Sequence, residues 1–168
     1  ICGMSEENIK HNIINNIIDP VLFSSIKDTL TGDTFFWLYN DFVNYRPCEG
    51  YRFTNEIIKD SSLTHSLFIN YLNMVKPVLD KIHLKKLHSV RFNLFTKTLE
   101  PQKYLINHHK NNKVSILFAN NTNGGIEINN TFIKSTENQL ISFDSNTEYK
   151  IVTPTDNKIF TYLVINYE

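Results

Sequence analysis

The chain is short of cysteine and glycine, and it lacks the motifs that these residues build. Only two cysteines, Cys2 and Cys48, occur among 168 residues. With one of them near the start of the chain, we expect reduced thiols and a reducing compartment rather than a structural disulfide. Five glycines leave little room for a phosphate-binding loop, and no glycine-rich nucleotide motif is present. These shortages argue against a secreted disulfide scaffold and against a nucleotide-binding enzyme.

An excess of charge is also missing, since 17 Lys plus Arg balance 17 Asp plus Glu. A balanced chain does not provide the basic surface that nucleic acids and anionic membranes require, so we expect neither as a partner. Zero net charge lowers solubility unless a partner covers part of the surface. We therefore expect a protein partner, and an oligomer is possible.

Long hydrophobic runs are absent as well. No apolar stretch approaches the roughly 20 residues that span a bilayer. Residues 1–18 contain acidic and Asn residues where a signal peptide would have its apolar core. The sequence therefore predicts a cytoplasmic protein without a membrane-spanning segment.

The hydrophobic pattern changes from helical to alternating near residue 87. Residues 6–18 and 62–83 carry apolar side chains at helical spacing, and residues 21–30 predict a shorter helix between them. From residue 87 apolar and polar side chains alternate, as they do in strands with one buried face. The strands that we expect after this point cover residues 90–95, 114–119, 126–128, 131–134, 139–143, 148–153 and 158–167.

Turn signals separate these predicted strands. Asn120 to Gly125 should form one such turn, with Gly124 and Gly125 supplying positive φ angles. Many short strands at close spacing predict an antiparallel sandwich, jelly roll or barrel. We predict one α+β domain over residues 1–168, with a helical flanking region over 1–86 and a strand-rich core over 87–168.

Several segments between about residue 35 and residue 167 resemble, in order and spacing, one known family. These segments are Phe36–Asn40, Val90–Leu94, Ser115–Gly125, Glu137-Asn138, Phe143-Asp144, Pro154–Lys158 and Ile165–Tyr167. They are similar to the iron(II)- and 2-oxoglutarate-dependent oxygenases, in particular the small prolyl-hydroxylase-like proteins of marine phages. The resemblance implies a double-stranded β-helix, a cupin-like jelly roll, preceded by N-terminal flanking helices. Frequent Asn, Ile and Lys, which AT-rich coding favours, point to a virus or to a low-GC genome.

The resemblance also implies an iron site. Members of the family hold Fe(II) with a His-x-Asp pair and a second, distant His, which leaves positions free for 2-oxoglutarate and dioxygen. In this chain His108 or His109 would be the first His, and they are the candidate metal ligands. The carboxylate position then falls on Lys110 or Asn111. Lys110 would repel the iron, and Asn111 is a neutral substitute for a carboxylate.

The downstream positions of the family pattern are also substituted. The second His position falls on Tyr149, and the Arg that holds the distal carboxylate of 2-oxoglutarate falls on Phe160 or Ile159. No His follows His109, and no Arg follows Arg91. We expect Tyr149 and Phe160 to turn inward and fill the mouth of the barrel.

These substitutions predict a degenerate site with no catalytic residues and no cofactor. The leading interpretation is a non-catalytic binding or structural module, a viral accessory protein of the host cytoplasm or the virion. One alternative is an active oxygenase that uses Fe(II) and 2-oxoglutarate with rearranged ligands around His108 and His109, with Asp144 as a further candidate. Another is a small-ligand binder whose barrel mouth uses Arg91 and Tyr149.

An aromatic cluster in the first half of the chain has two interpretations. Residues 36–39 have the sequence Phe-Trp-Leu-Tyr. Such a cluster most often packs into a core and plugs one face of a sheet. Exposed Trp and Tyr side chains, however, are typical anchors of interfaces, so a contact patch remains the alternative.

Overall fold

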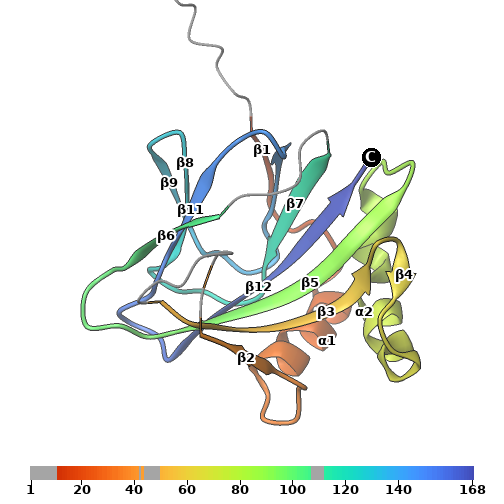
Figure 1. Ribbon diagram of the computed structural model, residues 1–168, viewed down its shortest axis with the longest axis horizontal. Coiled ribbons are helices and arrows are strands. Elements are labelled where there is room, and N and C mark those ends of the chain that lie inside the picture. The colour runs from red at the N-terminus through yellow and green to blue at the C-terminus, as the bar shows by residue number, and fades with distance from the viewer. Residues whose placement is uncertain (1–10, 42, 44–49, 107–111) are drawn as a thin grey trace, which may run out of the picture.

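The chain folds into two antiparallel sheets, with helices packed on the outer face of the larger one (Figure 1). The computed structural model describes residues 11–41, 43, 50–106 and 112–168. The larger sheet has the strand order β1 (Asn12–Ile14), β10 (Leu140–Asp144), β7 (Lys113–Phe118), β12 (Ile159–Tyr167), β5 (Leu87–Thr96), β3 (Arg52–Lys59) and β2 (Leu38–Asn40), and β4 (Ser62–Leu63) also pairs with β3. The smaller sheet has the order β6 (Lys103–Ile106), β11 (Tyr149–Val152), β8 (Gly125–Ile128) and β9 (Thr131–Lys134). The predicted jelly roll, a double-stranded β-helix in an α+β chain, is confirmed.

Two hydrophobic cores form because neighbouring residues on a strand face opposite ways. Leu117 of β7 and Leu163 of β12 belong to the core beneath the helices. Their neighbours Ile116 and Val164 belong to the core between the two sheets. The central strands of the larger sheet therefore bury both faces, and they carry nearly continuous apolar runs.

The first helix, α1 (Pro20–Thr31), matches the helix expected over residues 21–30. Asp19 caps its N-terminus, since the Oδ1 atom accepts a hydrogen bond of 2.8 Å from the backbone N–H of Val21. Pro20 suits the first helical position, where its missing N–H costs nothing. Phe23, Ile26 and Leu30 then form the buried stripe that packs against the larger sheet.

The helix predicted over residues 62–83 is shorter than expected. Ser62-Leu63 form β4, a 3₁₀ turn covers Ser66–Phe68, and α2 runs from Ile69 to Lys81 through Pro77. Val75 and Val78 are its buried residues, and they contribute to the same core as α1. The apolar spacing located the helix, but the strand pairing of residues 62–63 with β3 competes with its first turns.

The helix predicted over residues 6–18 is wrong in its described part. Asn12–Ile14 form β1, which pairs antiparallel with β10 at the edge of the larger sheet. Isoleucine is β-branched and suits a strand, and the open edge of β10 supplies the hydrogen-bonding partners. Ile17 and Ile18 are buried in the core beneath the helices without being helical.

The first half of the chain is not wholly helical, because β2 and β3 extend the larger sheet beyond β5. The register between β3 and β5 shifts between Glu56 and Ile58. This irregularity buries the adjacent residues Ile57 and Ile58 together. A bulge of this kind interrupts the period of two, which explains why the alternation did not reveal the strand.

No glycine among the described residues has a positive φ angle, contrary to our expectation for Gly124 and Gly125. Asn129 and Asn130, with φ angles of 49° and 63°, form the turn between β8 and β9 instead. Gly124 is required for space, since a Cβ atom there would lie 2.7 Å from the carbonyl oxygen of Val152. Neither helix of the described chain is long and apolar enough to cross a membrane.

The packing of Phe160 leads to a first prediction. Its side chain is fully buried between the sheets, with ring centroids 5.8 Å from Phe118 and 5.1 Å from Tyr162. Phe160→Ala should lower the free energy of unfolding by roughly 3–5 kcal/mol through the cavity that it leaves. Urea unfolding followed by circular dichroism would measure the loss. Phe132→Ala is the control, because Phe132 on β9 is 46% exposed; equal losses for both variants would contradict the prediction.

Candidate functional site

The interior between the two sheets is largely filled by aromatic rings. Tyr149 on β11 is 2% exposed and lies 5.3 Å from Phe143, measured between ring centroids. Tyr162 on β12 is buried as well, and its ring stacks on Phe95 at 6.2 Å. Together with Phe160 these side chains occupy the inner positions of β11 and β12.

Burial keeps the two tyrosine hydroxyls protonated. It raises the pKa of Tyr149 well above its usual value, and the charge of Tyr162 would raise it further. Burial likewise raises the pKa of Tyr162. The positive charges of Arg52 and Arg91 act in the opposite direction on both groups and are outweighed. The two hydroxyls therefore stay protonated even in the alkaline range where an exposed tyrosine would ionise.

A strip of polar side chains continues this inner face across β5, β3 and β2, and we call it the inner polar strip. Its members are Asn40, Thr54, Glu56, Arg91 and Asn93. Arg91 and Glu56 are register partners, and the guanidinium donates to the Glu56 carboxylate at 2.7 and 3.1 Å. Asn40 donates to the Thr54 hydroxyl at 2.8 Å.

Asn93 is the unusual member of the inner polar strip. It is 1% exposed and lies opposite Tyr162 on one side and Thr54 on the other. Its Oδ1 atom is buried and has no hydrogen-bond partner within the part of the chain that the structure describes. Buried acceptors are nearly always satisfied, so an unpaired one calls for an explanation such as a missing ligand or water.

The sequence-predicted site residues fall into two groups. His108, His109, Lys110 and Asn111 lie outside the described residues. Tyr149 and Phe160 are buried in one cluster between the sheets, while Arg91 pairs with Glu56. That Tyr149 and Phe160 stand where the family has His and Arg stays a prediction.

The described residues do not fit an iron centre of the facial type. Such a centre needs two imidazoles and a carboxylate on one side of the metal. Across residues 11–41, 50–106 and 112–168, no group of three or more His, Cys, Asp and Glu side chains comes together. Asp144, at the end of β10, is exposed.

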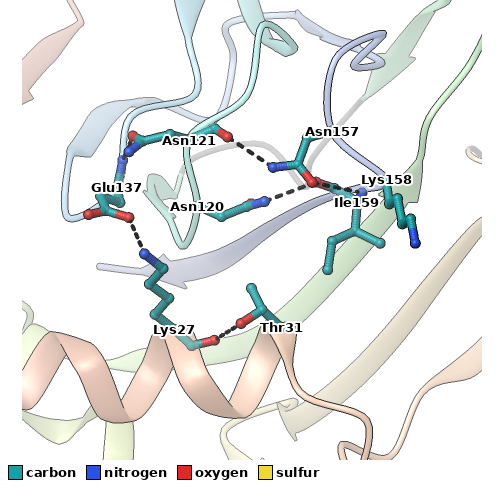
Figure 2. Close-up of a pocket in the computed structure, with 8 residues that line it drawn as sticks. All are labelled: Lys27, Thr31, Asn120, Asn121, Glu137, Asn157, Lys158 and Ile159. Carbon is teal, nitrogen blue, oxygen red and sulfur yellow. Dashed lines mark hydrogen bonds and ion pairs between the residues drawn. The ribbon is translucent and has the colours of Figure 1, made fainter.

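A polar cleft that sequence reasoning missed lies on the other side of the larger sheet (Figure 2). It has a volume of about 570 Å³ and opens between α1, the loop after β7 and the segment before β12. Its lining includes Lys27, Thr31, Asn121, Glu137, Asn157 and Ile159. The clue in the sequence was the Asn120-Asn121 pair directly after a predicted strand, which we had interpreted only as a turn.

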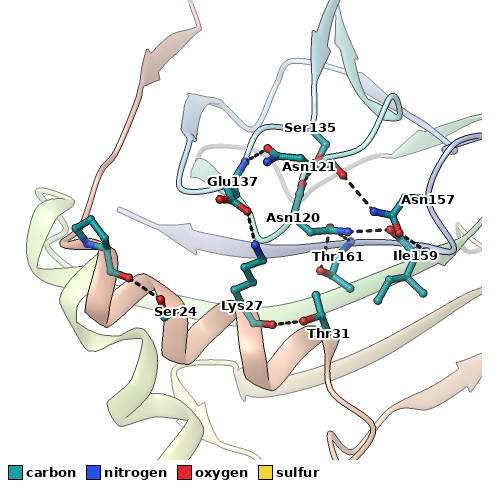
Figure 3. Close-up of polar contacts among 11 residues, drawn as sticks. Ser24, Lys27, Thr31, Asn120, Asn121, Ser135, Glu137, Asn157, Ile159 and Thr161 are labelled. Carbon is teal, nitrogen blue, oxygen red and sulfur yellow. Dashed lines mark hydrogen bonds and ion pairs between the residues drawn. The ribbon is translucent and has the colours of Figure 1, made fainter.

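Hydrogen bonds from Asn120 hold this cleft together (Figure 3). The buried Asn120 side chain donates to the carbonyl of Ile159 at 2.9 Å and accepts from the backbone N–H of Thr161 at 3.0 Å. The backbone carbonyl of Asn120 accepts a hydrogen bond of 2.6 Å from the Ser135 hydroxyl. Asn120 is therefore a structural residue that ties the end of β7 to β12.

The rim of the cleft is tied together by side chains from distant segments. Lys27 of α1 forms an ion pair of 2.7 Å with Glu137. The Asn121 side chain accepts from the backbone N–H of Glu137 at 2.9 Å, and Asn157 donates to the Asn121 carbonyl at 3.3 Å. Four segments thus meet around one hollow: α1, the loop after β7, the loop before β10 and the segment before β12.

Comparison with known proteins finds similarity in structure only. No protein-family model matches the chain, and no curated protein matches its sequence. A 2OG-Fe(II) oxygenase family oxidoreductase from Burkholderia pseudomallei is 10% identical, with a TM-score of 0.64 over 94% of this chain and 84% of that one. A prolyl-4-hydroxylase from Pseudomonas putida is 10% identical, with a TM-score of 0.59 over 96% and 94% of the two chains. A viral collagen prolyl hydroxylase from Paramecium Bursaria Chlorella virus-1 is 7% identical, with a TM-score of 0.55 over 99% and 97%.

These comparisons correct one sequence-based expectation. We expected no cofactor, but the solved structures that share this fold are named as 2OG-Fe(II) or prolyl hydroxylase proteins. The substitutions at the expected ligand positions did not justify that expectation. The candidate metal ligands His108 and His109 lie outside the described residues. The chain has the oxygenase-like double-stranded β-helix fold.

Proposed function

We propose that this protein is a non-catalytic binding module on an oxygenase-like scaffold. The observation that carries the proposal is the burial of Tyr149 and Phe160 between the two sheets. If the resemblance aligns them correctly, a metal ligand and the residue that holds 2-oxoglutarate have both been replaced by packed aromatic rings. Neither position then offers the imidazole or guanidinium on which oxygenase chemistry depends.

The inner polar strip is the part of the interior that can still bind a ligand. Leaving a buried acceptor unpaired costs about 1–3 kcal/mol, and a ligand that donates to Asn93 would recover this free energy. The neighbouring Arg91–Glu56 pair is partly exposed, with side-chain exposures of 37% and 21%. It offers a donor and an acceptor beside Asn93, so the strip suits a small polar group, either of a free ligand or of a protein partner.

The biological setting belongs to the same proposal. The fold shared with a viral collagen prolyl hydroxylase supports a viral accessory role, as does the resemblance of the sequence segments to the phage-type family. The balanced charge supports a protein partner, because such a chain gains solubility when part of its surface is covered. We place the protein in the host cytoplasm or the virion.

A turnover assay tests the non-catalytic proposal directly. The purified chain, supplied with Fe(II), ascorbate, dioxygen and 2-oxoglutarate, should release no succinate above the rate without protein. The reason is that Phe160 provides no cationic group for the distal carboxylate of 2-oxoglutarate. The Pseudomonas putida prolyl-4-hydroxylase serves as the positive control. Succinate release that disappears in a His108→Ala, His109→Ala double variant would establish an active oxygenase and overturn the proposal.

Two buried asparagines provide a matched test of the inner polar strip. Asn93 is 1% exposed with an unpaired Oδ1, whereas Asn120 is 5% exposed with both amide atoms bonded. Asn120→Leu should lower the free energy of unfolding by roughly 1–3 kcal/mol more than Asn93→Leu does. The reason is that it leaves the carbonyl of Ile159 and the N–H of Thr161 without their hydrogen-bond partner. Urea unfolding of both variants would measure the difference. Equal losses would mean that Asn93 has a structural role and is not held ready for a ligand.

A further inference from the structure

The outer face of the larger sheet joins the polar cleft to a group of exposed aromatic rings. Ile159, in the lining of the cleft, lies opposite Thr96 of β5. The Thr96 hydroxyl shares a hydrogen bond of 2.7 Å with the Tyr51 hydroxyl. Residues directly opposite each other in an antiparallel pair project from the same face. The cleft and Tyr51 therefore belong to one surface, separated by about two strand spacings, or ~10 Å.

Tyr51 is one of three rings in mutual contact, which we call the aromatic platform. Its members are Tyr39, Tyr51 and Phe53. Their centroids lie 6.0 Å apart for Tyr39 and Tyr51, 5.7 Å for Tyr39 and Phe53, and 6.3 Å for Tyr51 and Phe53. Tyr39 is 62% exposed and Tyr51 is 44% exposed. The aromatic cluster of residues 36–39 is therefore divided, since Trp37 packs against the core while Tyr39 faces outward.

The combination of cleft and platform matches the chemistry of a carbohydrate. A sugar ring has an apolar C–H face, which an exposed tyrosine ring can cover, and a rim of hydroxyls that both donate and accept. In the cleft, the amides of Asn121 and Asn157 and the carboxylate of Glu137 supply groups of both kinds. We propose that this surface binds a short oligosaccharide, with one ring stacked on Tyr39 or Tyr51 and further hydroxyls in the cleft.

The charges favour a neutral ligand over a nucleic acid. Stacked aromatic rings also bind single-stranded nucleic acid, but that binding needs cations that follow the phosphates. Of the two lysines that line the cleft, Lys27 is paired with Glu137, which leaves Lys158. The whole chain has no net charge. A neutral, hydroxyl-rich ligand can bond to the polar groups of this surface, and it carries no phosphates that would need cations.

The test uses the purified full chain and defined probes. Saturation-transfer NMR would be run with short linear oligosaccharides of glucose, N-acetylglucosamine, galactose and mannose, and with an oligouridine for comparison. We expect at least one oligosaccharide to bind, with an affinity that changes little between low and high salt. Binding of none of the sugars would overturn the proposal, as would binding of oligouridine alone with a steep salt dependence.

Point variants then locate the site. Tyr39→Ala and Asn157→Ala should each weaken oligosaccharide binding roughly tenfold or more, since the former removes a stacking ring and the latter a hydroxyl partner. Phe132→Ala and Asn73→Ala are the matched controls, because they remove an exposed ring and an exposed amide from β9 and α2. Thermal melts would verify that each variant is folded. Unchanged binding in both site variants, or equal losses in the controls, would place the sugar elsewhere and refute the assignment.

Discussion

The central strands of the larger sheet bury both of their faces, and the rest of the structure depends on this constraint. In β7 and β12 the residues Leu117 and Leu163 support the helices, while Ile116 and Val164 support the smaller sheet. A shift of register by one residue would exchange these two sets. The helices and the smaller sheet can therefore dock in only one way, and this docking places α1 beside the polar cleft.

The inner face of the larger sheet differs in polarity from one end to the other. Toward β11 and β12 it is closed by Tyr149, Phe160 and Tyr162, which pack as a hydrophobic core. Toward β3 and β5 it becomes polar, and Asn93 retains an acceptor without a partner. One end of the interior is therefore a packed aromatic core, and the other end carries polar side chains around an unpaired acceptor.

Much of the fold could be predicted from the sequence, because the alternation of β5, β7 and β12 is a local property of the chain. The expected inward orientation of Phe160 followed from the same alternation. Five strands of the described chain, β1, β2, β3, β4 and β6, escaped prediction, and the physical reason is plain for two of them. The bulge in β3 places Ile57 and Ile58 side by side in the core, which breaks the period of two. Strand β1 exists because β10 offers an open edge, and nothing within residues 11–18 indicates that edge.

The sequence by itself determined the β-rich core and the position of α1. These features depend on side-chain type and on spacing along one segment. Only the tertiary structure decided the sites. The cleft brings Lys27, Asn121 and Asn157 together from three distant segments, and the aromatic platform pairs Tyr39 with Tyr51 across two strands. Asn93 and Asn120 are both buried asparagines, but the Oδ1 atom of Asn93 is unpaired and that of Asn120 accepts a backbone hydrogen bond. Only their neighbours in space make this difference, because those neighbours decide which hydrogen bonds can form.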